Sequence, residues 1–309
     1  MAQAPDSAQI GEAWDRIRPY IHRTPVIETT EAVPGVPLSL KLEHMQKSGS
    51  FKVRGAFNSL LSADVPEAGV VAASGGNHGA AVALAATRLD IPAKIFVPEM
   101  AGPSKIGVIQ STGADLTVVP GAYANALEAA LEHEARTGAM QIHAYDGFRT
   151  VEGQGTAFAE WEDQGLDCDT VLVAVGGGGL ISGAMSWFGD SRKIIAVEPE
   201  TAPTLNAALE AGGPVDVEVS GIAANALGAR RIGSICYDLA SSRKIDSLLV
   251  PDDAIADAQV ALWSGLRQWV EPAAAAALAA IMSGAYTPAS GERLAVIVCG
   301  ANPAPGPFG

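Results

Sequence analysis

Short apolar runs recur along the chain, separated by alanine-rich stretches in which the apolar residues follow helical spacing. The runs predict strands at residues 38–42, 70–73, 93–97, 116–119, 171–175, 193–197, 247–250 and 294–298. The stretches between them predict helices, among them 79–88, 125–137, 180–187 and 253–269. Continuous apolar strands that alternate with helices are typical of an α/β fold, in which helices cover both faces of a mainly parallel sheet.

Composition indicates a protein that works on small molecules. The 309 residues, 48% of them hydrophobic, suffice for one large or two moderate cores. Twenty basic and 34 acidic residues give a net charge of 20 − 34 = −14, which repels nucleic acid and anionic membranes. The longest apolar run, residues 273–282, is shorter than the roughly 20 residues that span a bilayer, and no basic-then-apolar leader is visible. We expect neither nucleic acid nor a membrane as partner.

The cysteines indicate a reducing compartment. Cys168, Cys236 and Cys299 are odd in number, far apart, and in no metal-type spacing. We therefore expect a cytoplasmic protein without a disulfide framework, and we predict no cysteine metal site.

Lys52 is a candidate catalytic residue because of its neighbours. It lies in Ser48-Gly49-Ser50-Phe51-Lys52-Val53-Arg54-Gly55, directly after an expected strand. Glycine and serines let the backbone crowd against a ligand, Phe51 offers an aromatic face, and a lysine held there can act as an amine nucleophile. A solvated lysine that begins a helix is the alternative, and most lysines are of that kind.

Three loops at the carboxyl ends of expected strands, where open sheets bind ligands, carry further candidates. In Gly176-Gly177-Gly178-Gly179, bare amides between a strand and a helix can bind a phosphate, although a flexible linker is the alternative. In Ser74-Gly75-Gly76-Asn77-His78-Gly79, the amides and polar side chains can bind a carboxylate and Asn77 a phenolic oxygen, although a plain helix cap is the alternative. The third loop is Cys299-Gly300-Ala301-Asn302. By itself, a cysteine at a strand end is usually a small apolar core residue, and only the other two loops make Cys299 a candidate site residue.

Together, an aldehyde-reactive lysine, a phosphate loop and a carboxylate loop match pyridoxal 5'-phosphate and its amino-acid adduct. These motifs, with Gly-Gln-Gly-Thr at 153–156 and Val-Glu-Pro at 197–199, resemble those of the threonine/serine dehydratase and serine racemase family, in order and over nearly the whole chain. The resemblance implies pyridoxal-phosphate fold type II, as in the tryptophan synthase β subunit. Its two open, mainly parallel sheets form a large domain (1–68 and 147–309) and an inserted small domain (69–146), and the family is usually homodimeric.

The resemblance also assigns roles to residues. It makes Lys52 the Schiff-base lysine and the base that removes the α-proton, and it places Asn77 at the phenolic oxygen. Phe51 would face the cofactor ring and Cys299 the pyridine nitrogen. The remaining roles are phosphate binding by Gly176, Gly177, Gly178 and Gly179, and contact with the substrate carboxylate by Ser74, Gly75, Asn77 and His78.

Three features bear on the reaction and its cofactors. Racemases that resemble this chain carry a serine at the position of Gly75 as the second acid/base, so its absence favours ammonia-lyase over racemase chemistry. A neutral thiol at Cys299 makes a shallower electron sink than an acid and favours β-elimination. Glu198 with Ala202 resembles the start of a divalent-cation site, but Thr204 stands where an acid is expected. A weakened cation site and an ordinary strand-end glutamate both remain open.

The sequence thus predicts a pyridoxal-phosphate-dependent ammonia-lyase that converts L-threonine and L-serine to 2-oxobutanoate and pyruvate, with release of ammonia. Three alternatives remain: dehydration of another β-hydroxy amino acid such as 3-hydroxyaspartate, serine racemisation, and a non-catalytic cofactor-binding protein.

Overall fold

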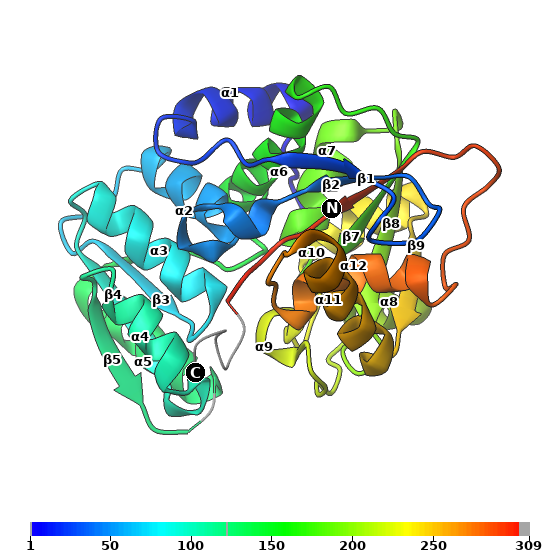
Figure 1. Ribbon diagram of the computed structural model, residues 1–309. Coiled ribbons are helices and arrows are strands. Elements are labelled where there is room, and N and C mark those ends of the chain that lie inside the picture. The colour runs from blue at the N-terminus through cyan, green and yellow to red at the C-terminus, as the bar shows by residue number, and fades with distance from the viewer. Residues whose placement is uncertain (1, 122, 303–309) are drawn as a thin grey trace.

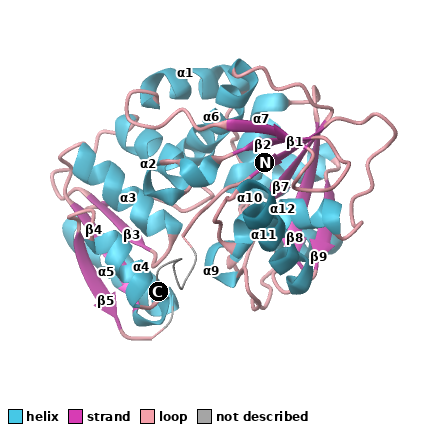
Figure 2. Ribbon diagram, viewed as in Figure 1, coloured by secondary structure: helices cyan, strands magenta, loops and turns pink. Residues whose placement is uncertain are grey.

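The computed structural model describes residues 2–121 and 123–302 and contains two separate β-sheets, each covered by helices (Figures 1 and 2). The six-stranded sheet has the order β1-β2-β10-β7-β8-β9, and only the β1–β2 pair is antiparallel. The four-stranded sheet has the order β5-β4-β3-β6 and is parallel throughout. The predicted fold class, two mainly parallel sheets covered by helices, is confirmed.

Every predicted strand is present. The strands are β1 (Val26–Thr29), β2 (Leu38–Lys41), β3 (Val70–Ala73), β4 (Ala93–Pro98), β5 (Asp115–Val119), β6 (Met140–Gln141), β7 (Thr170–Ala174), β8 (Lys193–Pro199), β9 (Asp246–Val250) and β10 (Leu294–Ile297). The sequence did not predict β1 and β6. Both lie at sheet edges and are only partly buried, so they lack the continuous apolar run that marks the other strands.

The helices fall between the strands as expected. They are α1 (Ser7–Ile17), α2 (Lys52–Leu61), α3 (Asn77–Arg88), α4 (Pro103–Gln110), α5 (Tyr123–Thr137), α6 (Phe148–Asp163), α7 (Gly179–Phe188), α8 (Thr204–Ala211), α9 (Ala224–Leu227), α10 (Ser234–Arg243), α11 (Asp252–Leu266) and α12 (Pro272–Met282), with 3₁₀ turns at Glu43–Met45, Lys47–Gly49 and Glu99–Ala101. The helix predicted at 253–269 ends earlier, because Arg267 adopts a left-handed φ of 57° that stops it.

The two sheets occupy different parts of the sequence. The strands of the four-stranded sheet fall between residues 70 and 141, and those of the six-stranded sheet lie on either side of them. The domain bounds 69–146, 1–68 and 147–309 stay a prediction, and the last seven residues of the third segment lie outside the described residues.

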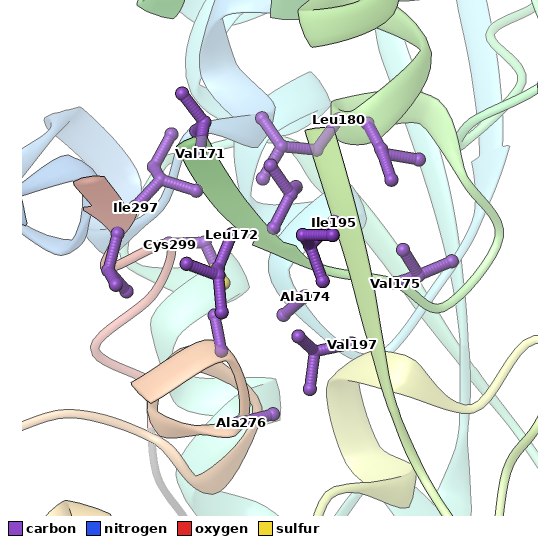
Figure 3. Close-up of a cluster of buried hydrophobic side chains, with 14 of the residues drawn as sticks. Val171, Leu172, Ala174, Val175, Leu180, Ile195, Val197, Ala276, Ile297 and Cys299 are labelled. Carbon is purple, nitrogen blue, oxygen red and sulfur yellow. The ribbon is translucent and has the colours of Figure 1, made fainter. Parts of the chain in front are cut away.

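The core of the six-stranded sheet is packed on one side by α12, as Figure 3 shows for Ala276 beside Leu172 and Val197. Residues 273–281 of α12 are all buried, and seven of these nine are alanines. Small side chains all around a helix let it lie close to strands and helices alike. Glycines do the same between α6 and α7, where a Cβ on Gly183 would lie 2.5 Å from the amide nitrogen of Gly155.

A buried network of charges ties α2 to β2 and α6. The Arg54 guanidinium donates to Glu43 at 2.7 Å through both Nε and Nη2, and to Glu160 at 3.0 Å. Lys41 donates to Glu160 at 2.6 Å. All four side chains are at least 98% buried, and Lys52 begins the helix that Arg54 anchors. Within the described ranges, no helix is both long and apolar enough to cross a membrane.

Candidate active site

The loop that carries Lys52 is paired with the loop that carries Cys299. Ser50 and Gly300 form an antiparallel bridge, and the Phe51 amide donates to the Cys299 carbonyl at 3.2 Å. Gly49 accepts from the Ala301 amide at 2.8 Å. Backbone hydrogen bonds therefore join two motifs from opposite ends of the sequence. Lys52, the first residue of α2, directly follows the joined segment.

The Lys52 ammonium lies in an environment that favours its neutral form. Its Nζ donates to the Ala144 carbonyl at 2.7 Å and lies 5.2 Å from the centre of the Phe51 ring. Desolvation lowers the pKa of Lys52 to about 8, against the opposing effects of Cys299 and Glu271. A lysine that loses its proton near neutral pH can act as nucleophile and base.

A cavity that is partly open to solvent lies at the carboxyl ends of β7 and β10 beside Lys52. Every residue that the sequence analysis places at the cofactor lines it, namely Phe51, Lys52, Asn77, Gly176, Gly177, Gly178, Gly179 and Cys299. The structure therefore brings the predicted cofactor set together. Ala226 and Leu227 of α9 and the ring of Tyr145 form further wall.

The tetraglycine loop has room for no side chain. A Cβ on Gly177 would overlap the ring of Tyr145, and one on Gly176 would lie 2.8 Å from the Cα of Leu227. Gly178 has a φ of 91°, and its Cβ would lie 2.5 Å from the Cys236 thiol. The loop lines the cavity and leads directly into α7, and bare amides next to a helix amino terminus are suited to a phosphate.

Asn77 is held by two residues that the sequence analysis did not place in the site. Its Nδ2 donates to Glu271 Oε1 at 2.6 Å, and its Oδ1 accepts from Asn302 Nδ2 at 2.7 Å. Glu271 is buried, and its carboxylate fills the space beside Gly300, where a Cβ would overlap it. Desolvation raises the pKa of Glu271 against the effects of Asn77, Lys105 and Lys52.

The loop of the predicted carboxylate residues lies at the carboxyl end of β3, but only Asn77 of this set lines the cavity. Ser74 Oγ accepts from the Gly76 amide at 3.2 Å and shapes the turn. A Cβ on Gly75 would overlap that of Ala101. His78 is buried, with its Nε2 2.9 Å from the Ile142 carbonyl oxygen, and desolvation lowers its pKa to about 3. The His78 ring is therefore neutral and faces the protein interior.

Cys299 is a neutral thiol in this setting. It is buried, and its Sγ donates a long hydrogen bond of 3.9 Å to the Ala273 carbonyl. Desolvation raises the pKa of Cys299, and the charge of Glu271 raises it further. The sequence could not establish this protonation state, because it depends on burial.

Glu198 is occupied by the protein itself. Its carboxylate accepts from the Thr204 hydroxyl at 3.0 Å, from the Leu205 and Asn206 amides at 2.7 and 2.8 Å, and from Ser247 at 2.8 Å. It thus caps the start of α8, which is the role of a strand-end glutamate. No group of three or more His, Cys, Asp or Glu side chains that could hold a metal is found in the described part of the chain.

Comparison with known proteins assigns the family. Residues 17–300 match the family described as "Pyridoxal-phosphate dependent enzyme". The chain belongs to this family. It is 36% identical to phenylserine dehydratase of Ralstonia pickettii (96% of this chain, 93% of the relative) and 34% identical to L-threonine ammonia-lyase of Thermotoga maritima (95% and 74%). The solved structure of maize serine racemase superimposes with a TM-score of 0.91 at 35% identity, over 97% of this chain and 94% of that one.

The cavity of this pyridoxal-phosphate family member fits the family's cofactor. The bare amides of Gly176–Gly179 are suited to a phosphate, the Lys52 amine is suited to an aldehyde, and the Asn77 amide is suited to a phenolic oxygen. Cys299 presents a neutral group to a ring nitrogen. We expect these residues to hold the cofactor.

Proposed function

We propose that the protein is an ammonia-lyase that converts L-threonine and L-serine to 2-oxo acids and ammonia. The observation that carries the proposal is that the cavity offers the Lys52 amine but the structure has no room for a side chain at Gly75, where racemases of the family carry their second acid/base. Lys52 lines the cavity, whereas Gly75 has no side chain, and the Cβ of Ala101 occupies the space where one would begin. Elimination needs a base on one face of the α-carbon, and racemisation needs a proton carrier on both.

The residues divide the chemistry. Pyridoxal phosphate, when bound, supplies the electron sink that makes the α-proton acidic. Lys52 removes that proton as a neutral amine, which its lowered pKa favours. We expect the amides of the loop 74–78 to orient the carboxylate, and Ala226, Leu227 and Tyr145 line the same cavity as Asn77 of that loop. The neutral Cys299 leaves the sink shallow, which favours departure of the β-hydroxyl over other fates.

A second candidate is a β-hydroxy amino acid with an aromatic substituent. Tyr145, Ala226 and Leu227 give the cavity an aromatic and aliphatic wall, suited to stacking and apolar contact. The similarity to phenylserine dehydratase supports the same substrate class. Dehydration of 3-hydroxyaspartate and serine racemisation remain alternatives, and the intact lysine and phosphate loop speak against a non-catalytic protein. A cytoplasmic homodimer remains our expectation.

A substrate panel tests this proposal. The purified, cofactor-loaded protein should release 2-oxobutanoate from L-threonine and pyruvate from L-serine, measured by keto-acid reduction with a coupled dehydrogenase. L-phenylserine and 3-hydroxyaspartate isomers complete the panel. If the protein turns over phenylserine but neither threonine nor serine, the substrate is the aromatic β-hydroxy amino acid of the second candidate. Absence of keto acid from every β-hydroxy amino acid would contradict the lyase assignment.

The pKa of Lys52 predicts how cofactor capture depends on pH. Only the neutral amine attacks an aldehyde, and the pKa of about 8 means that its fraction rises as pH increases through 8. The capture rate of the cofactor-free protein should therefore increase about tenfold per pH unit below 8 and level off above it. Stopped-flow absorbance measures this rate. If the midpoint of the pH profile lies near the ordinary lysine pKa of 10.5, desolvation does not lower the pKa of Lys52.

A further inference from the structure

The side-chain amide of Asn77 is held at both ends by residues from the carboxyl-terminal half of the chain. Its Oδ1 accepts from Asn302 Nδ2 at 2.7 Å, and its Nδ2 donates to Glu271 Oε1 at 2.6 Å. Glu271 and Asn77 both line the cavity, and Glu271 is only 4% exposed. The chemistry assigned to Lys52 and Cys299 uses neither Glu271 nor Asn302, so this buried carboxylate in the cavity wall has no role in it.

The direction of these hydrogen bonds is fixed at both ends. An asparagine amide has nearly the same shape when it is turned over, so its partners decide which way it points. Asn302 Nδ2 also donates to the Ser48 carbonyl at 2.8 Å, and a carbonyl oxygen can only accept. Asn302 therefore offers its NH2 group, and not its oxygen, to Asn77. Since the Glu271 carboxylate accepts at the other end, Asn77 cannot turn over without losing both hydrogen bonds.

Close packing keeps both partners of Asn77 in place. A Cβ on Gly49 would lie 2.6 Å from Asn302 Oδ1, and a Cβ on Gly300 would overlap the Glu271 carboxylate. The Glu271 amide also donates to the Gly300 carbonyl at 3.2 Å. Both side chains thus lie against backbone that only glycine leaves open to them.

The fixed amide offers a donor to the cavity. Asn77 Nδ2 carries a second N–H, for which no acceptor is found within residues 2–121 and 123–302. A ligand oxygen that binds beside Asn77 can take this N–H, whereas an amide turned over would present the lone pairs of Oδ1 instead. A donor favours the ionised form of a phenolic oxygen, and an acceptor favours its neutral form.

We propose that Glu271 and Asn302 are positioning residues for pyridoxal phosphate: by fixing the Asn77 amide, they present an N–H donor to the phenolic oxygen of the cofactor and keep that oxygen ionised. The inference rests on the family's cofactor and on the expected role of Asn77. It does not depend on which substrate or reaction the protein has.

The role of Glu271 is tested with two ligands of the cofactor-free protein, pyridoxal phosphate and 3-deoxypyridoxal phosphate, which differ only in the phenolic oxygen. Absorbance titration measures both dissociation constants. Glu271→Met should weaken pyridoxal phosphate about 10- to 100-fold and leave the deoxy analogue nearly unchanged. Glu271→Gln, which keeps an acceptor oxygen, should recover most of the loss. Glu28→Met is the matched control and should change neither constant, because Glu28 accepts from Ser39 on an edge strand and does not line the cavity.

The role of Asn302 is tested with Asn302→Asp, a change of charge at nearly constant size. A carboxylate can donate neither to Asn77 nor to the Ser48 carbonyl, so Asn77 should turn its Nδ2 toward residue 302 and its Oδ1 toward the phenolic oxygen. The spectrum of the cofactor-loaded variant should shift from the visible band of the ionised phenolic oxygen toward the near-ultraviolet band of the neutral form. The midpoint of this change in a pH titration should rise by about 1–2 units relative to the unchanged protein.

Either measurement can overturn the proposal. An equal loss for both ligands in Glu271→Met, or no loss for either, would show that Glu271 does not act through the phenolic oxygen. An unchanged spectrum of Asn302→Asp would show that Asn302 does not set the direction of the Asn77 amide. None of these measurements needs turnover, so a protein that shows both effects yet releases no keto acid would keep this inference and lose the lyase assignment.

Discussion

Replacing Lys52 with alanine is expected to abolish turnover and the absorbance of the covalently held cofactor. No other lysine lines the cavity within the described residues, and the Lys52 ammonium is the group whose pKa is brought to about 8 there. Loss of both nucleophile and base should reduce kcat at least about 1000-fold. The measurements are the visible spectrum after addition of pyridoxal phosphate and keto-acid release from L-threonine.

Lys94→Ala is the control for this experiment. Lys94 pairs with Asp115 and does not line the cavity, so its loss should leave spectrum and turnover unchanged. A covalent cofactor band that persists in the Lys52 variant would show that another amine holds the cofactor and would remove Lys52 from the mechanism.

Replacing Arg54 with methionine is expected to cost about 3–5 kcal/mol of stability. Burial alone would raise the pKa of Glu43, and Arg54 reverses this effect and holds that pKa below its ordinary value. Without the guanidinium, the Glu43 carboxylate still accepts a hydrogen bond from the Thr24 hydroxyl. It loses the two hydrogen bonds and the positive charge that Arg54 provides. Urea unfolding, followed by circular dichroism, measures the loss.

Arg18→Met is the matched comparison, because Arg18 pairs with Asp15 at the surface, where removal should cost less than about 1 kcal/mol. Equal midpoints for the two variants would contradict the structural role of the buried network. The Arg54 variant should also bind cofactor more weakly, since Arg54 anchors the helix that Lys52 begins.

The sequence predicted the elements that rest on local patterns. Runs such as residues 171–175 and 294–298 are apolar throughout because both faces of the six-stranded sheet are covered, and the loops after them are recognisable from glycine and polar residues. The edge strand β6 was missed because two residues carry no pattern.

Contacts between distant segments could not be predicted in the same way. Glu271 precedes a proline at the start of α12 and resembles an ordinary helix cap until the structure brings it to Asn77. Tyr145 lies in an irregular segment, and only the fold stacks it on Gly177. The sequence likewise shows that Gly75 provides no acid/base group. It does not show that Ala101 fills the space beside Gly75, because that contact depends on tertiary packing.

The most direct test of one-faced chemistry is the product ratio from L-serine. Cofactor-loaded protein is incubated with L-serine, and pyruvate and D-serine are quantified in the same sample by chiral chromatography. With Lys52 as the base and no side chain at Gly75, pyruvate should exceed D-serine by at least about 100-fold, because the acid/base group that racemisation requires at this position is missing. D-serine formed as fast as pyruvate, or faster, would contradict the account.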